Sequence, residues 1–175
     1  MSNLKRARAY TEIIIDKVEG GYSNHSADPG GETMWGITKN VARANGYLGP
    51  MRSMPKEKAI DIYLDRYWRP NFFSKIDNHL AFHLYDCTIN SGIMNAVKIL
   101  QGALGLAQDG VPGPATMQRV SETPEAQAVL LFNIRRMRFY SQLKTYGTFG
   151  RGWTNRLLTL ASLDWNKVKR DYGLD

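Results

Sequence analysis

The chain has 175 residues, 43% of them hydrophobic and 22% charged, and it carries a formal net charge of +7. This length and composition exclude an intrinsically disordered chain and suit one compact domain with its own hydrophobic core. The positive charge predicts affinity for an acidic partner, and charge alone leaves nucleic acid, anionic lipid and an acidic cell-wall polymer open.

The N-terminal segment predicts a helix that Asn3 caps and that Gly20 and Gly21 end, because glycine readily takes the left-handed conformation that closes a helix. Glu19 then lies in the last turn. The first residues are basic, as in a signal peptide, but the apolar run 13–15 is too short for one. We therefore expect no signal peptide, no stable membrane insertion and synthesis in the cytoplasm.

The segment 22–37 contains the sequence ADPGGET, whose Asp-Pro-Gly-Gly part is a strong turn signal. Its short, β-prone flanks predict a small β-hairpin lobe. Thr38 is then expected to cap a short helix over 39–45.

The remaining chain has helical periodicity, so the sequence predicts a mainly α (α+β) fold with its β element near the N-terminus. Thr123 and Pro124 are expected to open a long helix as its cap and first residue, and the sequence GTFGRGW is expected to break it. The expected helices span 53–68, 79–89, 95–104, a short stretch after the loop 108–116, 124–144 and 153–169.

Few side chains suggest a metal site or a nucleophile. His79 and His83 share a helix face, but no third ligand has zinc-site spacing, so we expect no metal. Cys87, the single cysteine, lies in an apolar run and is expected to be a buried small side chain. The densest basic group, RRMRF over 135–139, is expected to be a solvated helix face rather than a phosphate-binding stripe.

Glu19 is a candidate general acid. A carboxyl group among apolar neighbours holds its proton more tightly than one in water, and it can then protonate a glycosidic oxygen. Such an acid needs a second carboxylate or a hydroxyl that activates water, and Asp28 and Thr33 follow at the turn. The alternative is that Glu19 ends an exposed helix and that Asp28 only shapes the turn; spacing alone favours this alternative.

The sequence EGGYSNHSADPGGETMWGIT is similar to the signature of glycoside hydrolase family 108, which are phage and bacterial N-acetylmuramidases with a lysozyme-like fold. The resemblance implies that Glu19 is the catalytic acid. The spacing of Glu19, Asp28 and Thr33 also resembles the Glu-Asp-Thr triad of phage-type lysozymes, in which the threonine comes one residue later. Because of that difference, Glu32 is a rival for the second carboxylate.

A second stretch, LYDCTINSGIMNAVKILQGALGLAQDGVPGPAT, is similar to the peptidoglycan-binding region that accompanies this family. It implies contacts with peptidoglycan at Asp86 and Asn90, for which a structural role is an equal alternative. For the loop that contains Asp109, a structural role is favoured. We therefore expect a lysozyme-like catalytic lobe over 1–80 and a helical, peptidoglycan-binding lobe over 81–175, packed as one globular unit.

Aromatic side chains offer stacking surfaces for sugar rings, although large aromatic residues more often lie in the core. Tyr22 and Trp35 are the better candidates for substrate binding because of their neighbours, ahead of Tyr47 and Trp68.

The expected function is hydrolysis of the β-1,4 bond between N-acetylmuramic acid and N-acetylglucosamine by a monomeric phage endolysin that needs no cofactor. Such an enzyme is made in the host cytoplasm and reaches the cell wall after a separate protein permeabilises the membrane. Two alternatives keep bacterial peptidoglycan as the partner: a lytic transglycosylase, which uses one acid and no water, and a non-catalytic wall-binding protein. A nucleic-acid-binding role ranks last, because no recognition motif accompanies the charge. The sequence does not decide between inversion and retention of the sugar configuration, and analogy alone favours inversion.

Overall fold

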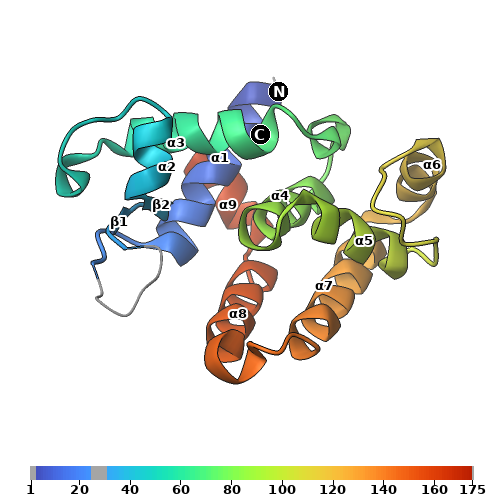
Figure 1. Cartoon of the computed structure of the whole chain (residues 1–175). Helices are drawn as coiled ribbons and strands as arrows, with labels where there is room; N and C mark the ends of the chain where they lie inside the picture. Colours follow the sequence, from blue (N-terminus) through green and yellow to red (C-terminus); the bar gives the residue numbers. More distant parts are fainter. Residues whose placement is uncertain (1–2, 25–30, 175) are drawn as a thin grey trace. The chain divides into compact units, whose positions relative to one another are not determined.

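Figure 1 shows the chain in a computed structural model, which describes residues 3–24 and 31–174. The chain folds into two compact units. The first unit comprises Met1–Pro70 and Asp164–Asp175, and the second comprises Asn71–Leu163. Helices make up most of the described chain, and its two strands form one antiparallel pair. The predicted mainly α fold with a small β-hairpin near the N-terminus is confirmed.

In the first unit, α1 (Asn3–Ile14) continues into a π-helical turn, η1 (Ile15–Glu19). The side chains that α1 buries include Ala7, Tyr10, Ile13 and Ile14. The helix ends where Gly20, with a φ of +67°, donates its N–H to the carbonyl of Ile15 at 3.2 Å. The predicted helix end after Glu19 is therefore confirmed, and the π turn makes Glu19 the last helical residue.

The hairpin of the first unit consists of β1 (Thr33–Met34) and β2 (Ile37–Thr38), with Thr33 opposite Thr38. Only Trp35 and Gly36 connect the strands, and their φ angles are +54° and +75°. Two positive φ angles in a two-residue connection are typical of the turn whose twist matches that of the flanking strands. The backbone therefore turns back sharply at these two residues.

The helices that follow the hairpin begin much as the sequence predicts. Thr38 accepts a hydrogen bond from the N–H of Val41 at 3.3 Å and caps α2 (Lys39–Ala44), which confirms its predicted role. After a 3-10 turn, η2 (Met51–Ser53), the next helix begins later than predicted, as α3 (Lys56–Tyr63). A second π-helical turn, η3 (Leu64–Trp68), completes it.

The last helix of the chain, α9 (Trp165–Tyr172), belongs to the first unit. Asp164 caps it by accepting two backbone N–H groups of its first turn. The ring of Tyr10 in α1 lies edge-on to Trp68 and to Trp165, at centroid distances of 5.9 and 6.2 Å. This aromatic cluster joins the two ends of the chain in one unit.

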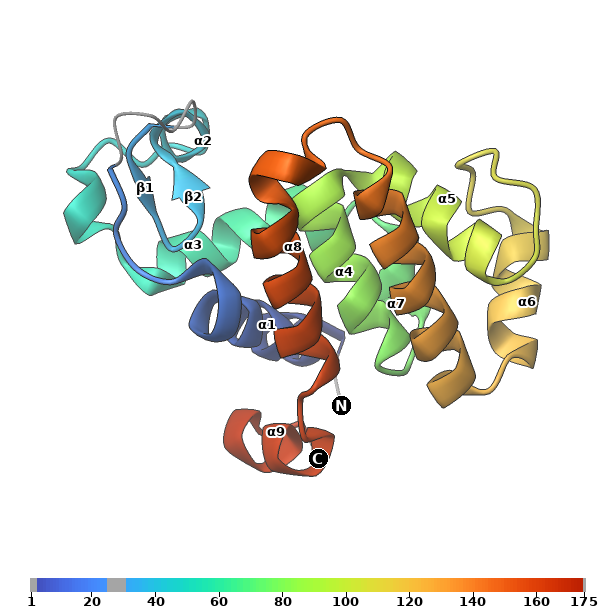
Figure 2. The ribbon, with the colours of Figure 1, turned by 90° about the horizontal axis from the view of Figure 1, so that it is seen from below.

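The second unit is a helical bundle. Its elements are η4 (Phe72–Lys75), α4 (Leu80–Ser91), α5 (Ile93–Ala103), α6 (Pro114–Glu122), α7 (Glu125–Ser141) and α8 (Tyr146–Ala161). Every residue from 80 to 88 is buried, because α5 and α7 pack against α4 while α8 packs against α7 (Figure 2). A helix that is buried all round, as α4 is, forms the core of a domain.

Two predicted details of the second unit are wrong. Thr123 does not cap α7, because its hydroxyl donates backward to the carbonyl of Arg119 at 2.7 Å and α7 starts without a side-chain cap. The sequence GTFGRGW does not break a helix but lies inside α8. Gly150 is buried there, and a β-carbon on it would lie 2.6 Å from the ring of Tyr146, so the glycine lets that ring pack on the helix.

Within residues 3–24 and 31–174, none of the helices has both the length and the apolar character needed to cross a membrane. Across that same part of the chain, no three His, Cys, Asp or Glu side chains group as metal ligands. Burial raises the pKa of Cys87 to about 11, so this thiol is a small core side chain, as predicted, and not a thiolate nucleophile.

Candidate active site

Glu19 lies half-buried at the end of η1, directly against the tip of the hairpin. A β-carbon built on Gly36 would lie 2.6 Å from Oε2 of Glu19 and 2.4 Å from the hydroxyl oxygen of Tyr63. Such distances are too short for any real contact, so only glycine fits between these groups. The turn therefore brings bare backbone next to the carboxyl group and the phenol.

The hairpin tip is held in place from two sides. The buried Tyr63 donates its hydroxyl to the carbonyl of Trp35 at 3.1 Å. The indole N–H of Trp35 donates to the carbonyl of Met54 at 2.9 Å. Both contacts connect the tip to the segment of η2 and α3. The turn that contacts Glu19 is therefore fixed in position. The residue that the structure places against Glu19 is Gly36, which follows Trp35, and stacking of Trp35 on sugar stays a prediction.

Tyr22 and Glu32, both predicted to bind substrate, contact each other. Tyr22 donates its hydroxyl to Oε1 of Glu32 at 3.0 Å, and the ammonium of Lys39 lies 3.2 Å from Oε2. The hydrogen bonds from Lys39 and Tyr22 hold the pKa of Glu32 below its ordinary value. The guanidinium of Arg52 lies over the Tyr22 ring at 4.1 Å. Glu32 is thus ionised at neutral pH, which does not suit the general acid, and both of its oxygens already have partners.

Thr33 is positioned by its backbone, which exchanges hydrogen bonds with Ser23 at 2.8 and 3.0 Å and pairs with Thr38 across the hairpin. Asp28 lies outside the described residues. The predicted grouping of Glu19, Asp28 and Thr33 therefore stays a prediction.

Asp86 belongs to the second unit and is fully buried between two arginines. Its Oδ2 lies 2.7 Å from Arg136, and its Oδ1 accepts from Arg156 at 2.6 and 2.9 Å. Burial opposes the charged form of Asp86, but the two guanidinium groups outweigh it and lower the pKa. This environment favours the structural alternative for Asp86, because a carboxylate without exposed surface has no access to a polymer.

Asn90 continues the same network. Arg136 donates through Nε to the hydroxyl oxygen of Tyr140 at 2.6 Å, and that hydroxyl donates to Oδ1 of Asn90 at 2.7 Å. The Asn90 side chain is only half-buried, so a contact with a ligand stays a prediction. The neighbouring His83 is buried, and burial together with Arg136 lowers its pKa to about 4, which keeps it neutral at physiological pH.

Two important side chains were missed by the sequence analysis. Arg136 was assigned to a solvated face, but it has no exposed surface. Gln101 is buried too, and it fixes the loop that follows α5 by donating to Oδ1 of Asp109 at 2.6 Å and accepting from the N–H of Gly110 at 2.9 Å. The contacts of Asp109, which also accepts from Val111, agree with the structural role expected for this loop. A polar residue inside an apolar helical run was the only signal for Gln101.

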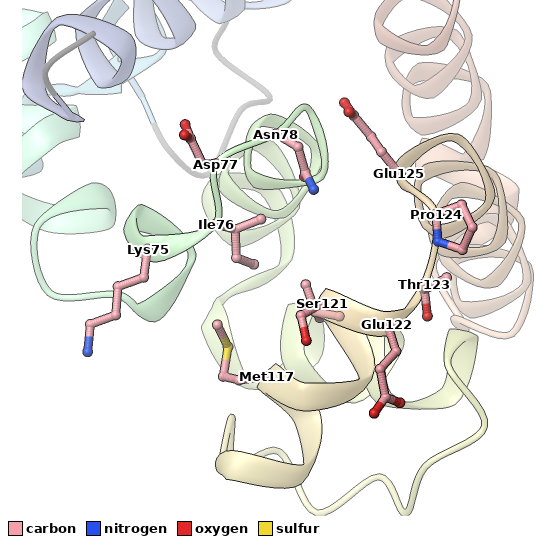
Figure 3. Close-up of a pocket in the computed structure, with 11 residues that line it drawn as sticks. Lys75, Ile76, Asp77, Asn78, Met117, Ser121, Glu122, Thr123, Pro124 and Glu125 are labelled. Atoms are coloured by element: carbon pink, nitrogen blue, oxygen red, sulfur yellow. The ribbon is translucent and has the colours of Figure 1, made fainter.

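The second unit also contains a pocket of about 490 Å³, between the segment before α4 and the junction of α6 with α7 (Figure 3). Glu125 accepts from the backbone N–H of His79 at 2.9 Å, and Asn78 accepts from that of Leu80 at 3.0 Å. These side chains cap the start of α4. Two polar groups of this pocket, those of Glu125 and Asn78, thus already have a structural task.

Comparisons with known proteins match two consecutive ranges of the chain, and the boundary between these ranges, at residues 92–95, lies within the second unit. A family model described as "Glycosyl hydrolase 108" matches residues 13–92, and one described as "Predicted Peptidoglycan domain" matches residues 95–158. The solved "Structure of Brucella abortus SagA" is similar over 92% of this chain and 94% of that chain, with 32% sequence identity and a TM-score of 0.74. No curated protein matches the chain. Asp86 and Asn90 fall within the first matched range, not in the peptidoglycan region to which the sequence resemblance assigned them.

The contact at Gly36 predicts a large effect of one methyl group. Gly36→Ala should lower the free energy of unfolding by about 1–3 kcal/mol more than Gly46→Ala, because the added carbon collides with Glu19 and Tyr63. Gly46 is the matched control, since it has a φ of +79° but open space around it. Urea unfolding of both variants measures the difference, and equal losses would contradict the close approach.

The buried arginine predicts a second difference. Arg136→Met should cost about 3–5 kcal/mol of unfolding free energy, because it leaves the buried Asp86 with only one cationic partner. Arg138→Met, an exposed position on the same helix, should change the free energy by less than about 0.5 kcal/mol. A small effect at residue 136, measured by urea unfolding, would show that the pair does not support the core.

Proposed function

Because the chain belongs to glycosyl hydrolase family 108, and is therefore a glycoside hydrolase that acts on peptidoglycan, we propose that it is an N-acetylmuramidase with Glu19 as its general acid. The bond cleaved is the β-1,4 linkage between N-acetylmuramic acid and N-acetylglucosamine. The observation that supports this most directly is the contact of the Glu19 carboxyl group with the fixed hairpin tip. An acid that must reach one oxygen atom benefits from such a fixed position.

In the proposed reaction, Glu19 gives its proton to the glycosidic oxygen as the bond from that oxygen to the muramic acid ring breaks. A water molecule adds to the ring carbon and loses a proton to a second carboxylate. We assign this second role to Asp28, with the Thr33 hydroxyl orienting the water, on the resemblance to phage-type lysozymes. Glu32 is the rival for this role, and it is ionised in its contact with Tyr22 and Lys39. No cofactor enters this reaction.

Binding of the glycan is assigned to side chains around the hairpin. Tyr22, Glu32 and Trp35 lie on the hairpin segment that also holds Gly36 against Glu19, and aromatic rings of this kind stack on sugars. Asn90 is retained as a candidate contact in the second unit, where its amide is half-exposed. Asp86 supports Asn90 indirectly, through Arg136 and Tyr140.

The biological role that we propose is that of a phage endolysin, a monomer that is made in the host cytoplasm and cleaves the wall after a separate protein opens the membrane. The sequence resemblance to phage muramidases supports it. The net charge of +7 also suits a substrate that is acidic through its peptide carboxylates and attached polymers. Nucleic acid is not expected as a partner.

The central test is digestion of purified peptidoglycan by the wild-type chain and by Glu19→Gln. The amide keeps the shape but has no acidic proton, so the rate should fall by at least about a hundredfold. Glu12→Gln is the matched control, since it makes the same change in α1 at a residue that pairs with Arg8. Mass spectrometry of borohydride-reduced products should find chains that end in reduced muramic acid.

Other products of this digestion would point to the alternatives. Anhydro-muramic ends from the wild type would make the protein a lytic transglycosylase. Binding of the wild type to peptidoglycan without any cleavage would make it a wall-binding protein, and full activity of Glu19→Gln would remove Glu19 from its role.

The second carboxylate can be assigned with the same substrate. Asp28→Asn should reduce the cleavage rate clearly while Glu32→Gln has the smaller effect, because only the group that accepts the proton of water is needed in its charged form. A silent Asp28→Asn together with a strong effect of Glu32→Gln would reverse the assignment. Thermal unfolding of both variants shows whether a loss of rate reflects a loss of fold.

A further inference from the structure

A compact cationic pocket of about 300 Å³ lies in the second unit, between α5 and α7. Lys98, Arg135 and Arg138 contribute three positive charges to its wall. Among the described residues that line it, none is acidic. The pocket therefore offers concentrated positive charge in a concave space, which neither the proposed reaction nor the core of the bundle requires.

The charges of this pocket are not neutralised within the described chain. Lys98, Arg135 and Arg138 form no ion pair with any residue of 3–24 and 31–174. The larger pocket of the same unit (Figure 3) has the opposite character, with three carboxylates and one lysine in its wall. Unpaired cations that face one hollow attract an anion, and guanidinium groups do so with directional hydrogen bonds.

The side chain of Arg135 is held in position by its neighbours. A β-carbon on Gly102 of α5 would lie 2.8 Å from Nε of Arg135, so the glycine leaves room for the side chain to lie on the helix. The amide of Gln108, in the orientation that satisfies both of its ends, accepts from Nη2 of Arg135 at 3.0 Å and donates to the carbonyl of Lys98 at 3.3 Å. A held guanidinium loses less freedom on binding than a free surface arginine does.

We propose that this pocket binds a free carboxylate of the peptidoglycan stem peptide, an inference that rests on the proposed action on peptidoglycan. The cations receive the carboxylate, and the amide side chains of Asn95 and Gln142 are placed to pair with peptide groups. Phe139 adds apolar surface for a small side chain such as that of alanine. All lining residues lie within the range matched by the peptidoglycan-domain model, 95–158.

The composition of the wall favours a peptide over a phosphate polymer. A peptide offers N–H groups to the side-chain carbonyl oxygens of Asn95 and Gln142, whereas a phosphodiester backbone offers none. A nucleic acid needs a stripe of charges along its backbone. Here Arg136, the middle arginine of the basic run, has no exposed surface, which confines the charge to the hollow.

The test is a calorimetric titration of the full chain with a soluble stem tetrapeptide that carries free carboxylates, and with the same peptide after amidation. Lys98→Gln/Arg135→Gln should weaken binding of the free peptide at least about tenfold, because a charge-assisted contact of this kind contributes about a factor of ten or more. Lys144→Gln/Arg151→Gln, which removes the same charge from exposed positions of the second unit, should leave binding unchanged. Amidation should weaken binding to the wild type as strongly as the pocket variant does.

Arg138→Gln provides a second variant in case the double change disturbs folding, since Arg138 is exposed and its loss should weaken binding while the melting temperature stays the same. Equal binding of free and amidated peptide, or equal losses in the pocket and control variants, would overturn the proposal. Displacement of the peptide by inorganic phosphate at matching concentration would make the site a phosphate site instead and would also overturn it. Absence of peptide binding in the millimolar range would also overturn the proposal.

The probe contains no glycosidic bond, so its result is separate from the test of Glu19. A chain that cleaves peptidoglycan but does not bind the peptide overturns this inference alone. A chain that binds the peptide but cleaves no glycan overturns the proposed reaction, while the inference about the pocket still holds.

Discussion

The contact between Gly36 and the carboxyl group of Glu19 is the constraint on which the first unit's site depends. It requires a helix that stops at Glu19, which the π turn and the positive φ of Gly20 provide. It also requires a residue without a side chain at position 36 and a tight turn, in which Trp35 and Gly36 both have positive φ angles. Tyr63 then fixes that tip from the side of α3. A strained φ at a tryptophan persists only where its surroundings hold it, as its two hydrogen-bonded neighbours do here.

The second unit depends on a different constraint, because its core contains the buried carboxylate of Asp86. Asp86 loses its hydration on folding, and only the pair of guanidinium groups compensates for that loss. An ion pair of this kind adds little net stability compared with apolar packing, but it forms in only one arrangement of its partners. Arg136 on α7 and Arg156 on α8 must therefore both meet α4 in a fixed register, and the half-buried amide of Asn90 is held as a consequence.

The sequence predicts those features that depend on neighbouring residues. Glycines after Glu19 ended the helix as expected, and Thr38 capped the next one through its own first turn. The sequence could not predict features that depend on distant partners. Nothing around Tyr63 indicates that its hydroxyl meets the hairpin. The same limit applies to Arg136, whose partner Asp86 lies fifty residues earlier. The glycines of GTFGRGW predict a helix break, but the ring of Tyr146, four residues before Gly150 on the same helix, covers Gly150, so here the local glycine signal itself was misleading.

The arginines of the basic run on α7 are neighbours in the sequence, but helical geometry directs them to different faces of the helix. Residues four apart lie on one face of a helix, so Arg136 and Tyr140 both turn toward α4 and the buried network. Residues at spacings of three, four and seven share another face, which places Arg135, Arg138 and Gln142 along the pocket. The same spacing on α5 brings Asn95 and Lys98 to the opposite wall and places Gly102 against the side chain of Arg135. Core packing and the cationic pocket are therefore built by two faces of one helix, and a change that rotates α7 to loosen the Asp86 pair would also open the pocket.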